Sequence, residues 1–125
     1  REGYRTAIVS NKLQAGVSAM YHRHYASLVH VAIGEHDGVR RKPAPDMIYE
    51  AIAQLGVQKE ECIYLGDSDV DILTARAAGL PCISVLWGFR DKEFLLAHGA
   101  TTLAQHPTDI LDILHRGQAL PILQP

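Results

Sequence analysis

The sequence is poor in the features that mark secreted, membrane-bound and nucleic-acid-binding proteins. Two cysteines in 125 residues are too few for the disulfide framework of a small secreted domain. No apolar run approaches the roughly 20 residues that a membrane helix needs, and no charged-then-apolar leader opens the chain. The 12 basic and 14 acidic residues are mixed along the chain and form no basic stripe. We therefore expect no nucleic-acid partner, no membrane partner and a cytoplasmic location.

The two cysteines, Cys62 and Cys82, each begin an apolar run that is typical of a strand. Small apolar side chains at such positions pack in a core, so we interpret both as core residues rather than as a disulfide pair. With 47% hydrophobic and 21% charged residues, the chain has the composition of one globular domain. We therefore predict a single domain over residues 1–125.

Strand-like and helical patterns alternate along the chain. The strand-like runs cover residues 6–10, 29–34, 62–66, 82–86 and a short stretch at 101–103. The helical patterns cover residues 13–28, 42–56, 71–79, 91–99 and 106–117. Gly56 and Gly79 suit helix ends, and Thr108 suits an N-cap. We expect the apolar tail, residues 118–125, to pack as a strap or to fray. The alternation predicts an α/β fold: a three-layer, Rossmann-like, mostly parallel sheet with helices on both faces.

Polar residues follow the predicted strands where each strand ends. Ser10 and Asn11 end the first strand, Lys42 lies in the loop after the second, and Asp67 follows the third. Ligands of such sheets bind beyond the carboxyl ends of the strands, so we expect these side chains at one edge. A hydroxyl, an ammonium and paired carboxylates suit a phosphate ester held with Mg²⁺. We interpret the acidic stretch "YLGDSDVD", residues 64–71, as the metal site.

Four segments resemble, in order, the second, third and fourth motifs of the haloacid dehalogenase-like hydrolases. They are "IVSNK" (8–12), "RRKPAPD" (40–46), "YLGDSDVDILTARAAGL" (64–80) and "VLWGFRD" (85–91). Their wording is most similar to the phosphoglycolate phosphatase-like branch, and the resemblance extends over nearly the whole chain. It implies a Mg²⁺-dependent phosphatase, a phosphoric monoester hydrolase that acts on a small phosphorylated metabolite.

The resemblance also implies a role for each matching residue. Ser10 would bind the phosphoryl group with help from the backbone at Asn11. Lys42 would steady the nucleophile and the phosphate. Asp67 would bind Mg²⁺ directly, and Asp71 would support the metal or its waters. The predicted site is therefore catalytic at Lys42 and Asp67, phosphate-binding at Ser10, Asn11 and Lys42, and metal-binding at Asp67 and Asp71.

The chain departs from the family pattern before Ser10. The first family motif, an Asp-x-Asp stretch that supplies the nucleophile forming an aspartyl phosphate, does not occur there, and neither does a cap domain. In the family, that first strand lies between the strands matching residues 62–66 and 6–10. Because the chain also begins with Arg1 rather than Met, we expect a partial core that needs an N-terminal segment or an oligomer partner. We expect residues 1–125 alone to be unstable or inactive.

Each candidate residue also has a structural interpretation. Ser10 and Asn11 are residue types that commonly begin a turn, and Lys42 lies in a short basic run that suits a solvated loop. Asp67 and Asp71 would stabilise the start of the next helix. Trp87 suits packing, and the scattered histidines have no spacing that favours a metal site.

Two other functions stay open. A receiver-like signalling domain has a similar length and a phosphoaccepting aspartate, but its lysine follows that aspartate, whereas Lys42 precedes Asp67. A non-catalytic remnant would keep the phosphate and Mg²⁺ site without the nucleophile. We favour phosphomonoester hydrolysis through an aspartate outside this chain, with phosphoglycolate as the leading substrate and pyrophosphate or a sugar phosphate as alternatives.

Overall fold

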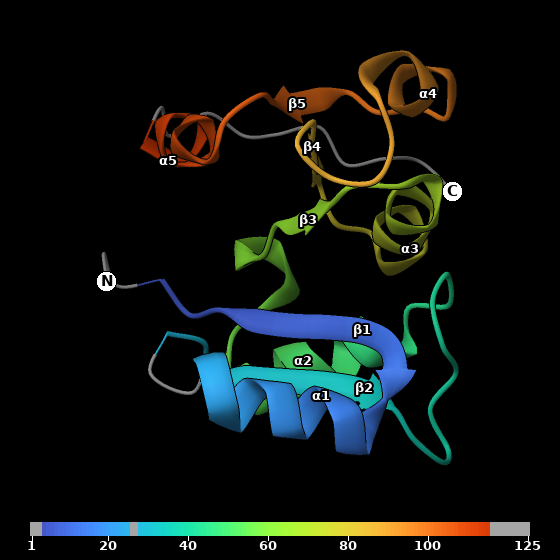
Figure 1. Cartoon of the computed structure of the whole chain (residues 1–125), viewed down its shortest axis with the longest axis vertical. Coiled ribbons are helices and arrows are strands. Elements are labelled where there is room, and N and C mark those ends of the chain that lie inside the picture. Colours follow the sequence, from blue (N-terminus) through green and yellow to red (C-terminus); the bar gives the residue numbers. More distant parts are fainter. Residues whose placement is uncertain (1–3, 26–27, 116–125) are drawn as a thin grey trace. The chain divides into compact units, whose positions relative to one another are not determined.

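The computed structural model describes residues 4–25 and 28–115, which fall into two compact units, Arg1–Glu61 and Cys62–Pro125. Each unit has a sheet whose strands pair in parallel, with helices on both of its faces (Figure 1). The predicted α/β class with parallel strands is therefore confirmed. The described strands form two sheets, of two and three strands.

The first unit is built around a two-stranded parallel sheet. In chain order it contains β1 (Ala7–Leu13), α1 (Gln14–Met20), the π-helix η1 (Tyr21–Tyr25), β2 (Val31–Glu35), α2 (Asp46–Leu55) and the 3₁₀ helix η2 (Lys59–Glu61). The pairing places Ala7 opposite Val31 and Val9 opposite Ile33. α1 lies on one face of this sheet and α2 on the other (Figure 1).

The core of the first unit lies between the sheet and α2. Ile33 from β2 packs there against Met47 and Ala51 from α2, all three of them buried. The buried positions of α2 recur with helical spacing, as the sequence predicted. The helix ends at Gly56, whose φ of +70° is the left-handed conformation that glycine adopts without a Cβ penalty.

The second unit contains a three-stranded parallel sheet in the order β3-β4-β5. Its elements are β3 (Tyr64–Gly66), α3 (Asp69–Ala78), β4 (Cys82–Val85), α4 (Lys92–Ala97), β5 (Thr102–Ala104) and α5 (Pro107–His115). On the face of α3 and α4, the buried core residues are Ile72, Ala75, Cys82 and Leu95. On the face of α5, they are Ile83, Val85, Ala104 and Ile113 (Figure 1). All four residues of β4 are buried, as expected for a central strand.

Several predicted boundaries are wrong. The helix expected at 13–28 is divided into α1 and the π-helix η1, and residues 26–27 lie outside the described ranges. Thr108 is not an N-cap, because α5 already begins at Pro107. The side chain of Asp109 instead accepts hydrogen bonds from the backbone N–H groups of Gln105 and His106, each at 2.9 Å. The predicted strap at 118–125 also lies outside the described residues.

Cys82 is buried in β4 as predicted, whereas Cys62 is only half-buried and precedes β3, so its predicted place in the core is wrong. Within the ranges 4–25 and 28–115, no helix combines the length and apolar character needed to cross a bilayer.

Candidate active site

Ser10 and Asn11 lie in an irregular stretch of β1 rather than after its end. Regular pairing stops at Val9 opposite Ile33 and resumes at Leu13 opposite Glu35, so that residues 10–12 face Gly34 alone. Within this bulge the Ser10 hydroxyl accepts a hydrogen bond from the N–H of Lys12 at 3.2 Å. Bulges re-aim side chains and are frequent beside active sites. The predicted polar pair therefore emerges where the ladder is broken, three residues before the strand ends.

Gly34 makes this bulge sterically feasible. A Cβ at this position would lie 2.7 Å from Cγ2 of Val17 and 2.8 Å from both the Cα of Gln14 and the carbonyl oxygen of Lys12. Real Cβ atoms do not approach backbone so closely, so only glycine fits. Its N–H donates a 2.7 Å hydrogen bond to Oε1 of Gln14, which attaches the start of α1 to β2.

The structure brings Asn11 to Lys42, 31 positions further along the chain. The Lys42 N–H donates to Oδ1 of Asn11 at 2.8 Å, and Nδ2 of Asn11 donates to the Lys42 carbonyl oxygen at 3.2 Å. One carboxamide thus pairs with both backbone polar groups of a single residue. The side chain of Asn11 holds the lysine loop, a contact that the sequence did not indicate.

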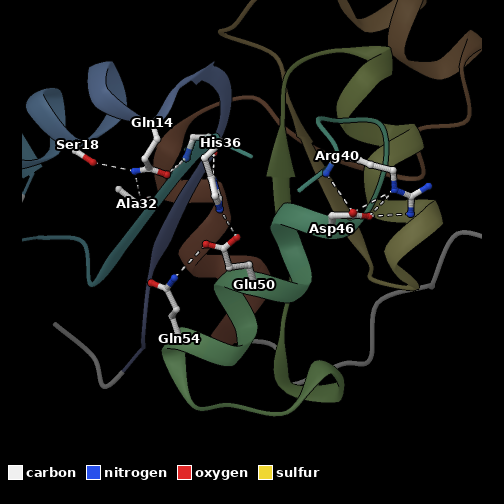
Figure 2. A network of polar contacts seen from close by, with 9 residues as sticks. Gln14, Ser18, Ala32, His36, Arg40, Asp46, Glu50 and Gln54 are labelled. Carbon is white, nitrogen blue, oxygen red and sulfur yellow. Dashed lines mark hydrogen bonds and ion pairs between the residues drawn. The ribbon is translucent and has the colours of Figure 1, made fainter. Parts of the chain in front are cut away.

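The same loop, residues 36–45, has two further ties to α2, both drawn in Figure 2. Nε2 of His36 lies 2.9 Å from Oε1 of Glu50, whose other oxygen accepts a hydrogen bond from Gln54 at 3.2 Å. Arg40 binds Asp46 through its guanidinium and also through its backbone N–H, the shortest contact being 2.8 Å. The loop that carries Lys42 is therefore held at three points, His36, Arg40 and Lys42 itself.

His36 has both ring nitrogens beside acceptors. Nδ1 lies 2.8 Å from the carbonyl oxygen of Gly34, and Nε2 faces Glu50. The Gly34 carbonyl, followed by the charge and hydrogen bond of Glu50, raises the pKa of His36 above its usual 6.5. Both contacts favour the imidazolium, which donates from both nitrogens.

In the second unit, Asp71 is the centre of the acidic stretch. Only 7% of the residue is exposed, and its carboxylate accepts three hydrogen bonds. The Tyr64 hydroxyl donates to Oδ1 at 3.0 Å, while the Asp67 N–H and the Ser68 hydroxyl donate to Oδ2 at 2.9 and 3.2 Å. Ser68 is also the N-cap of α3 and accepts from the Asp71 N–H at 3.4 Å. Asp71 thus fixes the turn between β3 and α3 that presents Asp67.

Asp67 is held from the other side by the loop between β4 and α4. Its Oδ2 accepts the N–H of Phe89 at 3.0 Å, and its backbone carbonyl accepts the N–H of Arg90 at 3.1 Å. Gly88 passes so close that a Cβ there would overlap the Asp67 side chain. Among the described residues, none donates a hydrogen bond to Oδ1 of Asp67.

Burial and the neighbouring acids control the protonation of two side chains near Asp71. Desolvation, followed by the charge of Asp71 and its hydrogen bond, raises the pKa of the Tyr64 phenol far above its usual value of 10. Desolvation likewise raises the pKa of the Cys82 thiol to about 11. Both groups stay neutral near pH 7, so the Tyr64 hydroxyl remains a donor to the Asp71 carboxylate.

The donor set fits a single divalent cation held by few protein oxygens. Mg²⁺ is usually bound through one or two carboxylates, with water and phosphate oxygens completing its shell. Oδ1 of Asp67 is available as a ligand, whereas the three donors on Asp71 suit a supporting acid. Within the described parts of the chain, no group of three or more His, Cys, Asp or Glu side chains is placed to hold a metal ion.

Several residues that contact Asp67 and Asp71 were not among the site residues predicted from the sequence. Tyr64 and Ser68 bind Asp71, and the loop at Gly88 and Phe89 supports Asp67. The spacing of Ser68 and Asp71 is the signature of an N-cap with an acid three positions later, and it could have indicated this contact. Trp87 lies in the same loop and is 48% exposed, so it is not a core residue, and of core and loop packing only the second stays open.

Comparisons with known proteins identify the family to which the chain belongs. A family profile described as "Haloacid dehalogenase-like hydrolase" matches residues 1–85. A phosphoglycolate phosphatase of Xanthomonas campestris pv. campestris is 45% identical over 81 residues, which are 64% of this chain and 37% of that protein. A phosphoglycolate phosphatase of Photorhabdus laumondii is 34% identical over 90 residues, covering 72% of this chain and 37% of that protein. The chain thus spans little more than a third of the length of these relatives.

A solved structure extends the similarity to the fold. The crystal structure of a candidate phosphoglycolate phosphatase from Lactobacillus delbrueckii subsp. bulgaricus superimposes with a TM-score of 0.88 at 40% identity. The match covers 90% of this chain and 47% of that protein. This likeness supports the predicted fold class, a mixed α/β fold of the Rossmann-like type with parallel strands.

Proposed function

Because the chain belongs to the haloacid dehalogenase-like hydrolase family, we propose that it supplies part of the active site of a Mg²⁺-dependent phosphatase. The observation that carries the proposal is the support given to Asp67. Asp71 holds its backbone and Phe89 holds Oδ2, while Oδ1 accepts no hydrogen bond from the described residues. A carboxylate fixed in this way is preorganised to bind a cation. The substrate class would be small phosphomonoesters.

The roles of the remaining residues follow from their chemistry. Asp67 would bind Mg²⁺ directly and Asp71 would support it, and the ion would neutralise charge on the phosphoryl oxygens. Ser10 and the backbone at Asn11 would hold the phosphoryl group, and Lys42 would stabilise the charge that develops during transfer. We propose that an aspartate outside residues 1–125 makes the attack and forms the aspartyl phosphate.

We further propose that both units belong to one partial core domain of this family. Phosphoglycolate is the leading substrate, because the two curated relatives described above are named phosphoglycolate phosphatases. The low cysteine content agrees with a cytoplasmic enzyme. The family match also favours a hydrolase over a receiver-like signalling domain.

The test is steady-state release of phosphate from phosphoglycolate by the intact phosphatase, with and without Mg²⁺. We expect Asp67→Asn and Lys42→Ala each to lower kcat about a hundredfold or more, as when a charge-stabilising group is lost. Asp69→Asn is the matched control, because Asp69 lies in the same turn and matches no family motif. Near-wild-type rates for either site variant would overturn the assignment. Mg²⁺-linked phosphate binding without turnover would instead support a non-catalytic remnant.

A further inference from the structure

Hydrogen bonds within the protein join the bulge in β1 to the loop at residues 36–45, and the binding of phosphate does not by itself require them. Asn11 pairs through its side chain with the N–H and the C=O of Lys42, at 2.8 and 3.2 Å. Two hydrogen bonds of opposite direction leave the backbone of one residue little rotational freedom. The contact acts on the lysine backbone, and hence on the direction in which the side chain leaves it.

We infer that Asn11 is a positioning residue: its carboxamide sets the backbone of Lys42 and couples it to Ser10, the adjacent residue in the bulge. This inference rests on the proposed phosphate-binding role of Lys42 and Ser10. It assigns the Asn11 side chain to the lysine rather than to the substrate.

The other contacts of the loop at residues 36–45 cannot replace the contact between Asn11 and Lys42. The Arg40 side chain that binds Asp46 is 75% exposed, and ion pairs with so much solvent contact are weak. His36 binds Glu50 at the start of the loop, six positions before Lys42. Both of these ties lead to α2, whereas the Asn11 contact leads to β1 and to Ser10. Asn11 therefore relates the lysine to the hydroxyl, the two groups proposed to bind the same phosphate.

The first part of the test is hydrogen exchange at the Lys42 amide, resolved to single residues in the intact protein. We expect Asn11→Ala to speed exchange at Lys42 about tenfold or more, because the acceptor of its N–H is lost. Asn11→Asp keeps that acceptor but loses the donor to the Lys42 carbonyl, so its effect should be smaller. Gln54→Ala is the control: it removes an exposed side-chain amide from α2 and should leave the exchange rate of the Lys42 amide unchanged. Unchanged exchange in both Asn11 variants would overturn the inference.

The second part is a double-mutant cycle on the binding of inorganic phosphate in the presence of Mg²⁺, measured by calorimetry. We expect Asn11→Ala to weaken binding about tenfold on its own and to have no further effect in a Lys42→Ala background. Losses that multiply in the double variant would show that Asn11 acts independently of Lys42, and would overturn the inference.

The cycle separates the inference from the proposed function. If Lys42→Ala alone leaves phosphate binding unchanged, the proposed role of Lys42 fails, and the inference that depends on it fails as well. If Lys42→Ala weakens binding but Asn11→Ala and Asn11→Asp do not, only the positioning role of Asn11 is overturned. Asn11→Asp, with nearly the same volume, keeps the test decisive if Asn11→Ala does not fold.

Discussion

The buried carboxylate of Asp71 accepts a hydrogen bond from the backbone N–H of Asp67, with 2.9 Å between the nitrogen and Oδ2. The second acid of the motif therefore holds the first one in place. With Tyr64 and Ser68 as its other donors, Asp71 receives three hydrogen bonds and has little solvent contact. A carboxylate in this setting contributes to stability as well as to the proposed metal site, and the two contributions can be measured separately.

Asp71→Asn is expected to destabilise the fold by about 1–3 kcal/mol. The amide has the size of the carboxylate, but with its NH₂ group toward Asp67 it would face an N–H that can only donate, and with the NH₂ group toward Tyr64 the hydroxyl would have to accept instead of donate. The free energy of unfolding in urea measures the effect. Asp69→Asn serves as the control, because Asp69 lies in the same first turn of α3 and its carboxylate receives none of these three bonds. Equal stability of the two variants would contradict the role of Asp71 as the centre of the turn.

Gly88→Ala is expected to destabilise the protein by about 1–3 kcal/mol, since the new methyl group would overlap Asp67 and force the loop away. The same change should weaken Mg²⁺ binding, because the Phe89 N–H that fixes Asp67 follows directly in the chain. Urea unfolding and calorimetric titration with Mg²⁺ measure the two effects.

Gly16→Ala is the opposite case and provides the control for Gly88→Ala. Gly16 lies inside α1, and apart from its chain neighbours and the backbone of the same helix, no atom of the described residues lies within 4 Å of a Cβ placed there. Alanine at this position should stabilise the protein by about 0.5–1 kcal/mol, as in other helix interiors. A destabilising Gly16→Ala, or a neutral Gly88→Ala, would show that the local spacing is not what the structure describes.

The parts of the fold that the sequence predicted correctly have local signals. α2 has an apolar stripe of helical period and ends at a glycine, so residues close in sequence determine it. The N-cap of α5 was wrong because Thr108 and Asp109 are adjacent and both are good caps, so the sequence does not show which side chain binds the free N–H groups. The irregular end of β1 was missed because a bulge depends on the partner strand, here on Gly34.

The same distinction between local sequence signals and long-range contacts applies to the candidate site. Lys42, Asp67 and Asp71 were selected from ordered motifs; Lys42 and Asp67 lie in loops after strands, whereas Asp71 lies in the first turn of α3. The pairing of Asn11 with Lys42 spans 31 positions, and no periodicity of the sequence encodes such a contact. The bond from Tyr64 to Asp71 was missed because Tyr64 has the apolar body of a strand residue, and its hydroxyl becomes informative only when its surroundings are known.

Cys62 is expected to react with iodoacetamide much faster than Cys82. The thiolate is the reactive form, and burial raises the pKa of the Cys82 thiol to about 11. Only a small fraction of Cys82 is therefore thiolate near neutral pH. Cys62 is half-buried, whereas Cys82 is 3% exposed in the central strand. Mass spectrometry of the alkylated protein, with Cys62→Ala and Cys82→Ala as controls, measures each rate. Faster alkylation of Cys82 under native conditions would contradict its burial in β4.

The tie between His36 and Glu50 should make stability depend on pH. The Gly34 carbonyl and Glu50 raise the pKa of His36 above 6.5 in the folded protein, so the protonated ring stabilises the fold. This stabilisation is complete below pH 6.5 and is lost as the pH rises through the higher pKa of the folded state. Glu50→Gln should lower the pKa of His36 in an NMR titration, and it should reduce the decrease in the urea midpoint of unfolding as the pH rises. Gln54→Ala keeps the charge of Glu50 and should change neither result. A pKa of His36 that does not respond to Glu50→Gln would exclude the ion pair as a cause and leave the Gly34 carbonyl alone to account for the shift.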